Sequence, residues 1–162
     1  MKKYKWIIII ANLVIVLFFF NRSLLQKEEL LANGKLILLE LAPVDPRSLM
    51  QGDYMALRYK VSSGIDRDSI SKRGYFVVKP DSVGVGKRLR IQKGTTPVKD
   101  GELLLNYTVG NWRLINIGAE SYFFEEGQSE KYSKAKYGAL KVDDKGNTLL
   151  IGLYDEKREI IK

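Results

Sequence analysis

The strongest hydrophobic pattern in the chain is a continuous apolar run near its N-terminus. Residues 6–20 (WIIIIANLVIVLFFF) carry no charge, three lysines precede them within the first five positions, and Arg22 follows. Crossing a hydrocarbon core of about 30 Å takes about 20 apolar residues, and Asn12 interrupts this run. A short span is still tolerated, because lysine and arginine side chains reach the interface and the bilayer can thin. The run therefore predicts a transmembrane helix.

The residues after this run distinguish a cleaved signal peptide from a permanent anchor. A cleavage site needs small residues, whereas the chain continues with Asn-Arg-Ser-Leu-Leu-Gln at 21–26. We therefore expect a cytoplasmic tail and uncleaved signal-anchor in residues 1–22, and a short helical stalk in 23–33 that ends at Asn33-Gly34. The N-terminal lysines place this end in the cytoplasm. The expected location is a single pass through the cytoplasmic (inner) membrane, with residues 34–162 as an extracytoplasmic or periplasmic domain.

After Gly34 the pattern changes to short apolar runs separated by glycine, asparagine and aspartate, which is typical of strands joined by turns. Residues 119–135 are less strand-like, and their glutamates and lysines favour one or two short helical turns. The predicted fold is mainly β, a sandwich or partly open barrel of about eight short strands. The predicted strands are 35–41, 54–61, 75–79, 87–92, 102–109, 112–117, 136–142 and 148–153.

Composition narrows the classes of function. The chain has no cysteine and no histidine, which excludes thiol nucleophiles, serine–histidine–aspartate triads and Cys/His zinc sites. Its formal charge of +8 belongs partly to the anchor, because beyond residue 22 there are 23 basic and 19 acidic residues. An outward-facing domain with so small an excess does not predict nucleic-acid binding. No metal site and no cofactor are expected.

A distinctive stretch leads into the second predicted strand. Pro43 and Pro46 favour an extended backbone before them, and Gly52-Asp53 supplies the turn into the strand. Strand alternation then places positions 55, 57, 59 and 61 on one face. Four charged residues gather around this entrance, either as an ion-pair network or as a binding site. They are Asp45, Arg47, Asp53 and Arg58.

Residues 52–59 read GDYMALRY and resemble the motif of the bacterial family named GDYxxLxY. The runs VDPRSLMQ at 44–51 and YFFEEGQ at 122–128 also resemble this family, so the resemblance covers essentially the whole chain. It implies a membrane-anchored envelope protein, often encoded beside multi-pass membrane proteins, and implies no particular activity. All five specified motif positions match: Gly52, Asp53, Tyr54, Leu57 and Tyr59.

Two further surfaces are candidates for contacts. The aromatic residues at 122–124 cannot all point inward from an extended backbone, so one of them is expected on a protein-contact surface. A basic group alternates along the strand predicted at 87–92 and is either a solvated face or a contact for anionic lipid headgroups or envelope polysaccharide. Its residues are Lys87, Arg88, Arg90 and Lys93.

These features favour a non-enzymatic accessory or assembly protein. We expect the anchor to bring it to a multi-pass membrane protein or an envelope component, with the outer domain making the contact. The alternative is an envelope ligand-binding module or hydrolase that uses Asp45, Arg47 and Asp53. The sequence leaves its oligomeric state open.

Overall fold

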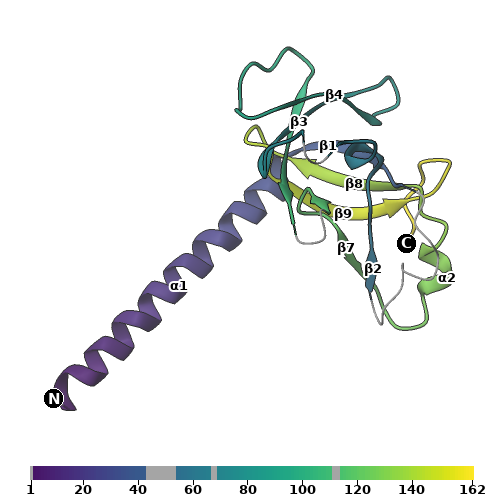
Figure 1. Cartoon of the computed structure of the whole chain (residues 1–162). Coiled ribbons are helices and arrows are strands. Elements are labelled where there is room, and N and C mark those ends of the chain that lie inside the picture. Colours follow the sequence, from purple (N-terminus) through teal and green to yellow (C-terminus); the bar gives the residue numbers. More distant parts are fainter. Residues whose placement is uncertain (1, 43–53, 67–68, 111–113) are drawn as a thin grey trace.

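The computed structural model describes residues 2–42, 54–66, 69–110 and 114–162. Helix α1 (Lys2–Asn33) is one continuous helix of 32 residues that projects away from the β-rich remainder (Figure 1). The most apolar window within Tyr4–Asn33 has a mean hydropathy of 2.2, and none of it is buried. By length and composition this helix could cross a membrane. The span and the stalk expected from the sequence are parts of this single helix.

The C-terminal end of α1 is fixed to the strands that follow. The Gly34 N–H donates to the Leu30 carbonyl oxygen at 2.9 Å, and Lys141 Nζ donates to the Gly34 carbonyl oxygen at 2.9 Å. Leu30 is buried, unlike the other α1 side chains that the structure describes. A cation beside the carbonyls of a helix end also interacts favourably with the helix dipole. The helix therefore meets the domain through an ordered contact.

The rest of the described chain forms nine strands in three sheets, and all of their pairings are antiparallel. One sheet has the order β1-β8-β9, a second β4-β3-β5-β6, and the third consists of β2 and β7. This confirms the mainly β fold. The elements after α1 are β1 (Lys35–Glu40), β2 (Tyr54–Ala56), the 3-10 helix η2 (Lys60–Ser62), β3 (Arg73–Pro80), β4 (Gly86–Gln92), β5 (Leu103–Val109), β6 (Ile115–Asn116), β7 (Ser121–Phe123), α2 (Ser129–Tyr132), β8 (Tyr137–Val142) and β9 (Thr148–Tyr154).

The two larger sheets share one hydrophobic core. Ile37 and Leu39 of β1 belong to the same buried cluster as Phe76 of β3 and Tyr107 of β5. The rings of Phe76 and Tyr107 stack with centroids 4.5 Å apart and an interplanar angle of 17°. Burying each such side chain contributes roughly 1.5–3 kcal/mol relative to exposure. This common core holds β1 and β3 together although they belong to different sheets.

The segment predicted as one strand at 54–61 is shorter than expected. Only Tyr54–Ala56 pairs as a strand, and the 3-10 helix Lys60–Ser62 follows after three residues. The expected inward face is nevertheless present, since Met55, Leu57, Tyr59 and Val61 are all buried. Alternation specifies which side chains are buried, but a ladder also needs a partner strand alongside. The sequence pattern therefore gave the right face and the wrong length.

The segment at 119–135 contains more strand than the sequence predicts. Its expected helical turn is present as α2, but residues 121–123 form β7, a strand that the sequence pattern did not predict. β7 pairs with β2 through Tyr54↔Phe123 and Ala56↔Ser121. The strand predicted at 112–117 is present only as β6 at its end, and residues 112–113 lie outside the described ranges. Short strands such as β6 and β7 depend on their neighbours more than on their own composition.

Aspartates close two hairpins. Asp81 Oδ1 accepts the N–H groups of Val83 (3.1 Å) and Val85 (3.0 Å) between β3 and β4. The Val85 N–H is the main reason that the pKa of Asp81 lies below its usual value. Asp143 binds the backbone of Lys145 and Asn147 in the same way between β8 and β9. Both carboxylates stabilise turns by satisfying backbone donors.

An ion pair closes the longer connection between β4 and β5. Arg90 donates from Nη1 and Nη2 to the two carboxylate oxygens of Glu102, each at 2.8 Å. The same carboxylate accepts the Lys99 N–H at 2.9 Å, and the Glu102 side chain is only 5% exposed. The Arg90 guanidinium, followed by the Lys99 N–H, lowers the pKa of Glu102 from its usual 4.5 to about 2. A bidentate pair of this kind is stronger than a single hydrogen bond.

We expect Glu102→Gln to destabilise the protein at neutral pH and to lose that effect in acid. A carboxyl whose pKa is lower in the folded state stabilises the fold above its unfolded pKa, and this contribution disappears between about pH 4.5 and pH 2. The measurement is the urea midpoint of the full chain in detergent micelles across this pH range. Glu126→Gln is the matched control, because Glu126 is exposed. A constant difference between wild type and Glu102→Gln over the range would contradict the assignment.

Candidate functional site

Of the GDYMALRY motif, the structure describes residues 54–59. Gly52 and Asp53 of the motif, and Asp45 and Arg47 before it, lie outside the described residues. From Tyr54 onward the segment pairs with three neighbours. β2 pairs with β7, the Leu57 N–H donates to the Glu120 carbonyl oxygen at 2.7 Å, and the Ala42 N–H donates to the Arg58 carbonyl oxygen at 2.8 Å. The described half of the motif is thus a connector between distant parts of the chain.

Tyr59, the last motif position, lies in the core. Its hydroxyl donates to the Ala119 carbonyl oxygen at 2.6 Å, and its own carbonyl oxygen accepts the N–H of Ser62 at 3.0 Å and the hydroxyl of Ser62 at 2.8 Å. Its backbone also forms an isolated antiparallel bridge with Leu41. A buried hydroxyl without a partner is costly, so this side chain needs the Ala119 carbonyl where it is. Tyr59 therefore links η2, the end of β1 and the chain before β7.

The environment of the Tyr59 hydroxyl opposes ionisation. Burial raises the pKa of Tyr59 first, and the negative charge of Glu120 raises it further. Glu120 itself accepts the backbone N–H groups of Ile117 and Gly118 with its two carboxylate oxygens. Both side chains are thus occupied in holding backbone around 117–120. A proton that is held so firmly suits a structural donor and does not suit acid–base catalysis near neutral pH.

The first tyrosine of the motif has a different role. The Tyr54 ring lies 5.8 Å from that of Phe123, its partner across the β2–β7 ladder. Phe123 is 74% exposed, more than any other large hydrophobic side chain that the structure describes. Its neighbours Tyr122 and Phe124 instead pack against Tyr132 of α2, with ring centroids 5.1 and 5.2 Å away. Of the three consecutive aromatic residues, Phe123 is the one that faces outward, as the sequence led us to expect of one of them.

Most side chains of the basic group on and just after β4 contact other groups of the protein. Lys87 Nζ lies 3.4 Å from the Asp81 carboxylate, and Arg90 pairs with Glu102 as described above. Arg88 Nη1 donates to the carbonyl oxygens of Val61 (2.5 Å) and Ser63 (3.2 Å), and its guanidinium lies over the Phe76 ring, 5.8 Å from the centroid.

Arg88 thereby ties β4 to η2, next to the motif. Lys87 and Lys93 are the exposed members of the group, so any contact with an anionic surface would fall mainly to these two lysines. That contact stays a proposal.

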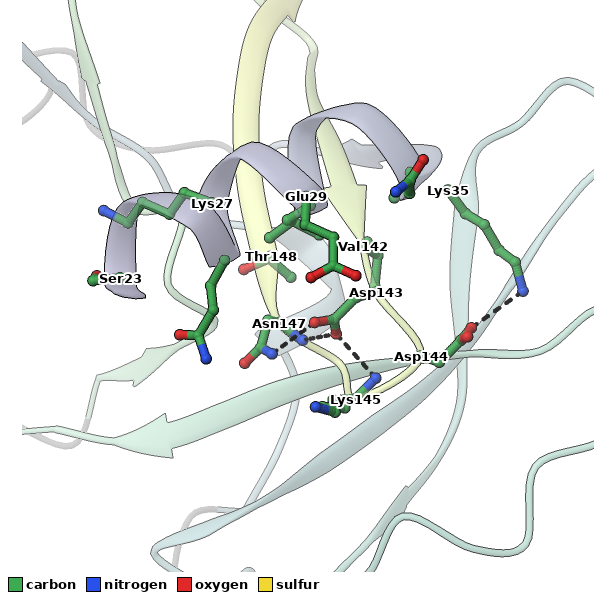
Figure 2. A pocket seen from close by; sticks show the side chains of 14 residues that line it. Ser23, Lys27, Glu29, Lys35, Val142, Asp143, Asp144, Lys145, Asn147 and Thr148 are labelled. Atoms are coloured by element: carbon green, nitrogen blue, oxygen red, sulfur yellow. Dashed lines mark hydrogen bonds and ion pairs between the residues drawn. The ribbon is translucent and has the colours of Figure 1, made fainter. Parts of the chain in front are cut away.

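A pocket of about 570 Å³ lies between the last turns of α1 and the β8–β9 hairpin. Figure 2 shows Lys27 and Glu29 of the helix opposite the hairpin residues 143–145. Lys35 Nζ lies 3.5 Å from Asp144 Oδ1, and Asp143 Oδ2 accepts the Asn147 side-chain amide at 2.7 Å. Acidic and basic groups are mixed around this pocket, and Lys35 pairs with Asp144, so its chemistry does not select one charge of ligand. Across the described residues, no three or more acidic side chains are placed to hold a metal ion.

The sequence analysis did not identify Ala119 and Glu120. Their carbonyl oxygens accept hydrogen bonds from the motif residues Tyr59 and Leu57. Ala119 contributes only a carbonyl oxygen, and Glu120 contributes a carbonyl oxygen and a turn-capping carboxylate. A backbone acceptor has no side-chain signature, so sequence gives no signal for it. The available signal was the aromatic, strand-favouring run at 121–123, which the glutamates and lysines around it obscured.

We expect Gly138→Ala to destabilise the fold through the motif tyrosine. A Cβ atom at Gly138 in β8 would lie 2.9 Å from Tyr59 Cε1 and 3.0 Å from the Tyr59 hydroxyl oxygen, and the hydroxyl cannot move without losing Ala119. Such overpacking costs about 1–3 kcal/mol of unfolding free energy. Urea denaturation of the full chain in detergent measures it. Gly94→Ala is the matched control, because its Cβ would meet nothing closer than 3.9 Å; equal midpoints for the two variants would refute this packing.

Comparison with known proteins agrees with the motif. The family model described as GDYXXLXY protein matches residues 16–153, from within α1 into β9. No curated protein and no solved structure matches the chain. Because the family match covers most of the sequence, and not only the eight residues of the motif, this chain belongs to the GDYXXLXY protein family.

Proposed function

We propose that the protein is a membrane-anchored accessory or assembly protein whose domain binds a membrane-protein partner or an envelope component outside the cytoplasm. Residues 1–22 supply the cytoplasmic tail and the signal-anchor, 23–33 the stalk and 34–162 the extracytoplasmic domain. The observation that carries the proposal is the exposed apolar helix α1, with a mean hydropathy of 2.2 and none of its most apolar window buried. In water such an apolar surface would favour aggregation, whereas in a bilayer the lipid chains solvate it.

The ordered joint between α1 and the sheet supports a role close to the membrane. From Arg22 to Asn33 the helix rises about 17 Å at about 1.5 Å per residue. The contacts of Leu30, Gly34 and Lys141 then fix the domain to this end of the helix. A domain held at this height can reach the extramembrane loops of a multi-pass protein without a flexible tether.

Phe123 is the surface feature that best fits a partner. An exposed aromatic ring beside a second ring, Tyr54, offers apolar contact area with little conformational entropy to lose. Among the titratable groups with shifted pKa values, Tyr59, Asp81 and Glu102 each hold nearby backbone or an ion pair. They lie in different parts of the fold, which favours a binding role over catalysis.

The proposed topology predicts that a C-terminal alkaline phosphatase fusion to the full chain is active and that an N-terminal tag stays attached to the membrane-bound protein. The phosphatase folds only on the oxidising side, and the N-terminal lysines favour the cytoplasmic side for their end. An inactive fusion would reverse the orientation. Release of the domain without its tag would show that the segment is a cleaved signal.

Phe123→Ala is expected to weaken partner binding by at least about fivefold, or about 1 kcal/mol, while leaving stability nearly unchanged. The measurement is recovery of the crosslinked partner from native membranes, quantified against wild type. Leu89→Ala is the matched control, since Leu89 is also exposed (52%) and lies on β4, in another sheet. Equal loss in both variants, or unchanged recovery in Phe123→Ala, would remove Phe123 from the contact surface.

A further inference from the structure

Helix α1 carries one polar side chain in the middle of its apolar stretch. Asn12 is the only residue between Ile7 and Phe20 whose side chain has a hydrogen-bonding group. It is exposed on the helix, and its amide forms no hydrogen bond with any residue that the structure describes. Asn21, near the end of the same stretch, behaves differently, because its Nδ2 donates to the Leu17 carbonyl oxygen at 2.9 Å. The Asn12 amide therefore has donors and an acceptor to offer.

The bilayer makes this unpaired amide expensive. Hydrocarbon offers no hydrogen-bond partner, and polar groups within membrane spans accordingly pair with other protein groups. Nothing in the described part of this chain packs against the first two-thirds of α1 (Figure 1). A hydrogen-bonding group on another polypeptide at the same depth would supply the partner that the Asn12 amide lacks.

The residues around Asn12 define one face of the helix. Ile8, Asn12, Ile15 and Phe19 follow one another at spacings of four, three and four residues, which places them along one side of α1. The three apolar members are all exposed. We name these four residues the Asn12 seam. Most other positions in the stretch are equally apolar, so only Asn12 distinguishes this face from the others.

We propose that α1 pairs in parallel with α1 of a second copy of this chain through the Asn12 seam, with the two Asn12 amides bonded to each other. An amide is its own complement, because it both donates and accepts. In a symmetric parallel pair the two amides necessarily meet at the same depth. A single asparagine at such a position fixes register and the number of helices in coiled coils. The proposal rests on the proposed function in one respect, namely that α1 remains in the membrane.

The chain allows a direct test, because it contains no cysteine and any disulfide must come from an introduced one. In membranes treated with a lipid-permeable oxidant, full-length chains with Ile8→Cys or Ile15→Cys are expected to form crosslinked dimers. Ile10→Cys and Val14→Cys lie about 200° around the helix from Asn12 and are expected to crosslink much less. Equal crosslinking on both faces would overturn the seam. Crosslinking of the seam positions to a different protein would overturn the second copy as its occupant.

The role of the amide itself is tested by Asn12→Leu, which keeps the side-chain size and removes the hydrogen bonds. Interhelical hydrogen bonds in membranes change association constants by about three- to thirtyfold, so a loss in this range is expected. Energy transfer between labelled full-length chains in lipid vesicles measures it. Asn21→Ala is the matched control, because the Asn21 amide is already satisfied within its own helix. Unchanged association of Asn12→Leu would refute the proposal.

Failure of the proposed function gives a different result from failure of this inference. If the anchor is cleaved, the N-terminal tag separates from the domain and both ideas fall together. If the tagged, membrane-bound chain is intact but monomeric, only the paired helix falls. A dimer held by the Asn12 face supports the inference and also requires the uncleaved anchor.

Discussion

The hydrogen bond from the Tyr59 hydroxyl to the Ala119 carbonyl oxygen (2.6 Å) is the contact on which the arrangement of the domain depends. A large aromatic ring gains by burial, but its hydroxyl is costly in the core unless it finds an acceptor. Meeting that demand brings residues 119–123 beside the motif, where Leu57 and β2 find their backbone partners. It also requires Gly138 next to the ring, because a side chain there would collide with it. One polar atom thus positions three separated segments.

The same requirement applies to several other polar groups in the domain, which are satisfied within the protein. Arg90 and Glu102 satisfy each other and the β4–β5 connection. Asp81 and Asp143 satisfy the backbone of their hairpins, and Arg88 satisfies carbonyl groups beside η2. Arg88 and Arg90 of the predicted basic group therefore act as internal connections. Groups that remain unsatisfied in their surroundings are the more informative ones.

Phe123 and Asn12 are two such groups, and they are opposites. Phe123 is an exposed apolar ring on the domain, whereas Asn12 is an exposed polar amide that the proposed anchoring would place in lipid. Each would gain from contact with another molecule, one by losing water from its surface and the other by gaining a hydrogen bond. Most of the length of α1 separates them, and its C-terminal end is fixed to the domain at Leu30 and Gly34.

Sequence patterns alone predict the features that depend on composition and on the regular repeat of side-chain direction along an element. The apolar run gave α1, and short alternating runs gave a mainly β fold. The GDYMALRY motif gave the family, and alternation gave the buried set from Met55 to Val61. These properties follow from local geometry, because side-chain direction along a strand or helix repeats with a fixed period.

Which segments pair with one another follows from the tertiary structure and not from the local sequence pattern. Strand β7 pairs with β2, and the bond from the Leu57 N–H to the Glu120 carbonyl oxygen continues that register by one residue. The Tyr59 hydroxyl then binds the Ala119 carbonyl oxygen. Arg88 and Arg90 were assigned to a surface by spacing alone, and their acceptors lie as far along the chain as Val61 and Glu102. Every residue has a backbone carbonyl, so the residue that accepts such a hydrogen bond cannot be identified from its side chain. The donor and the acceptor are identified only in the folded chain, where they lie side by side.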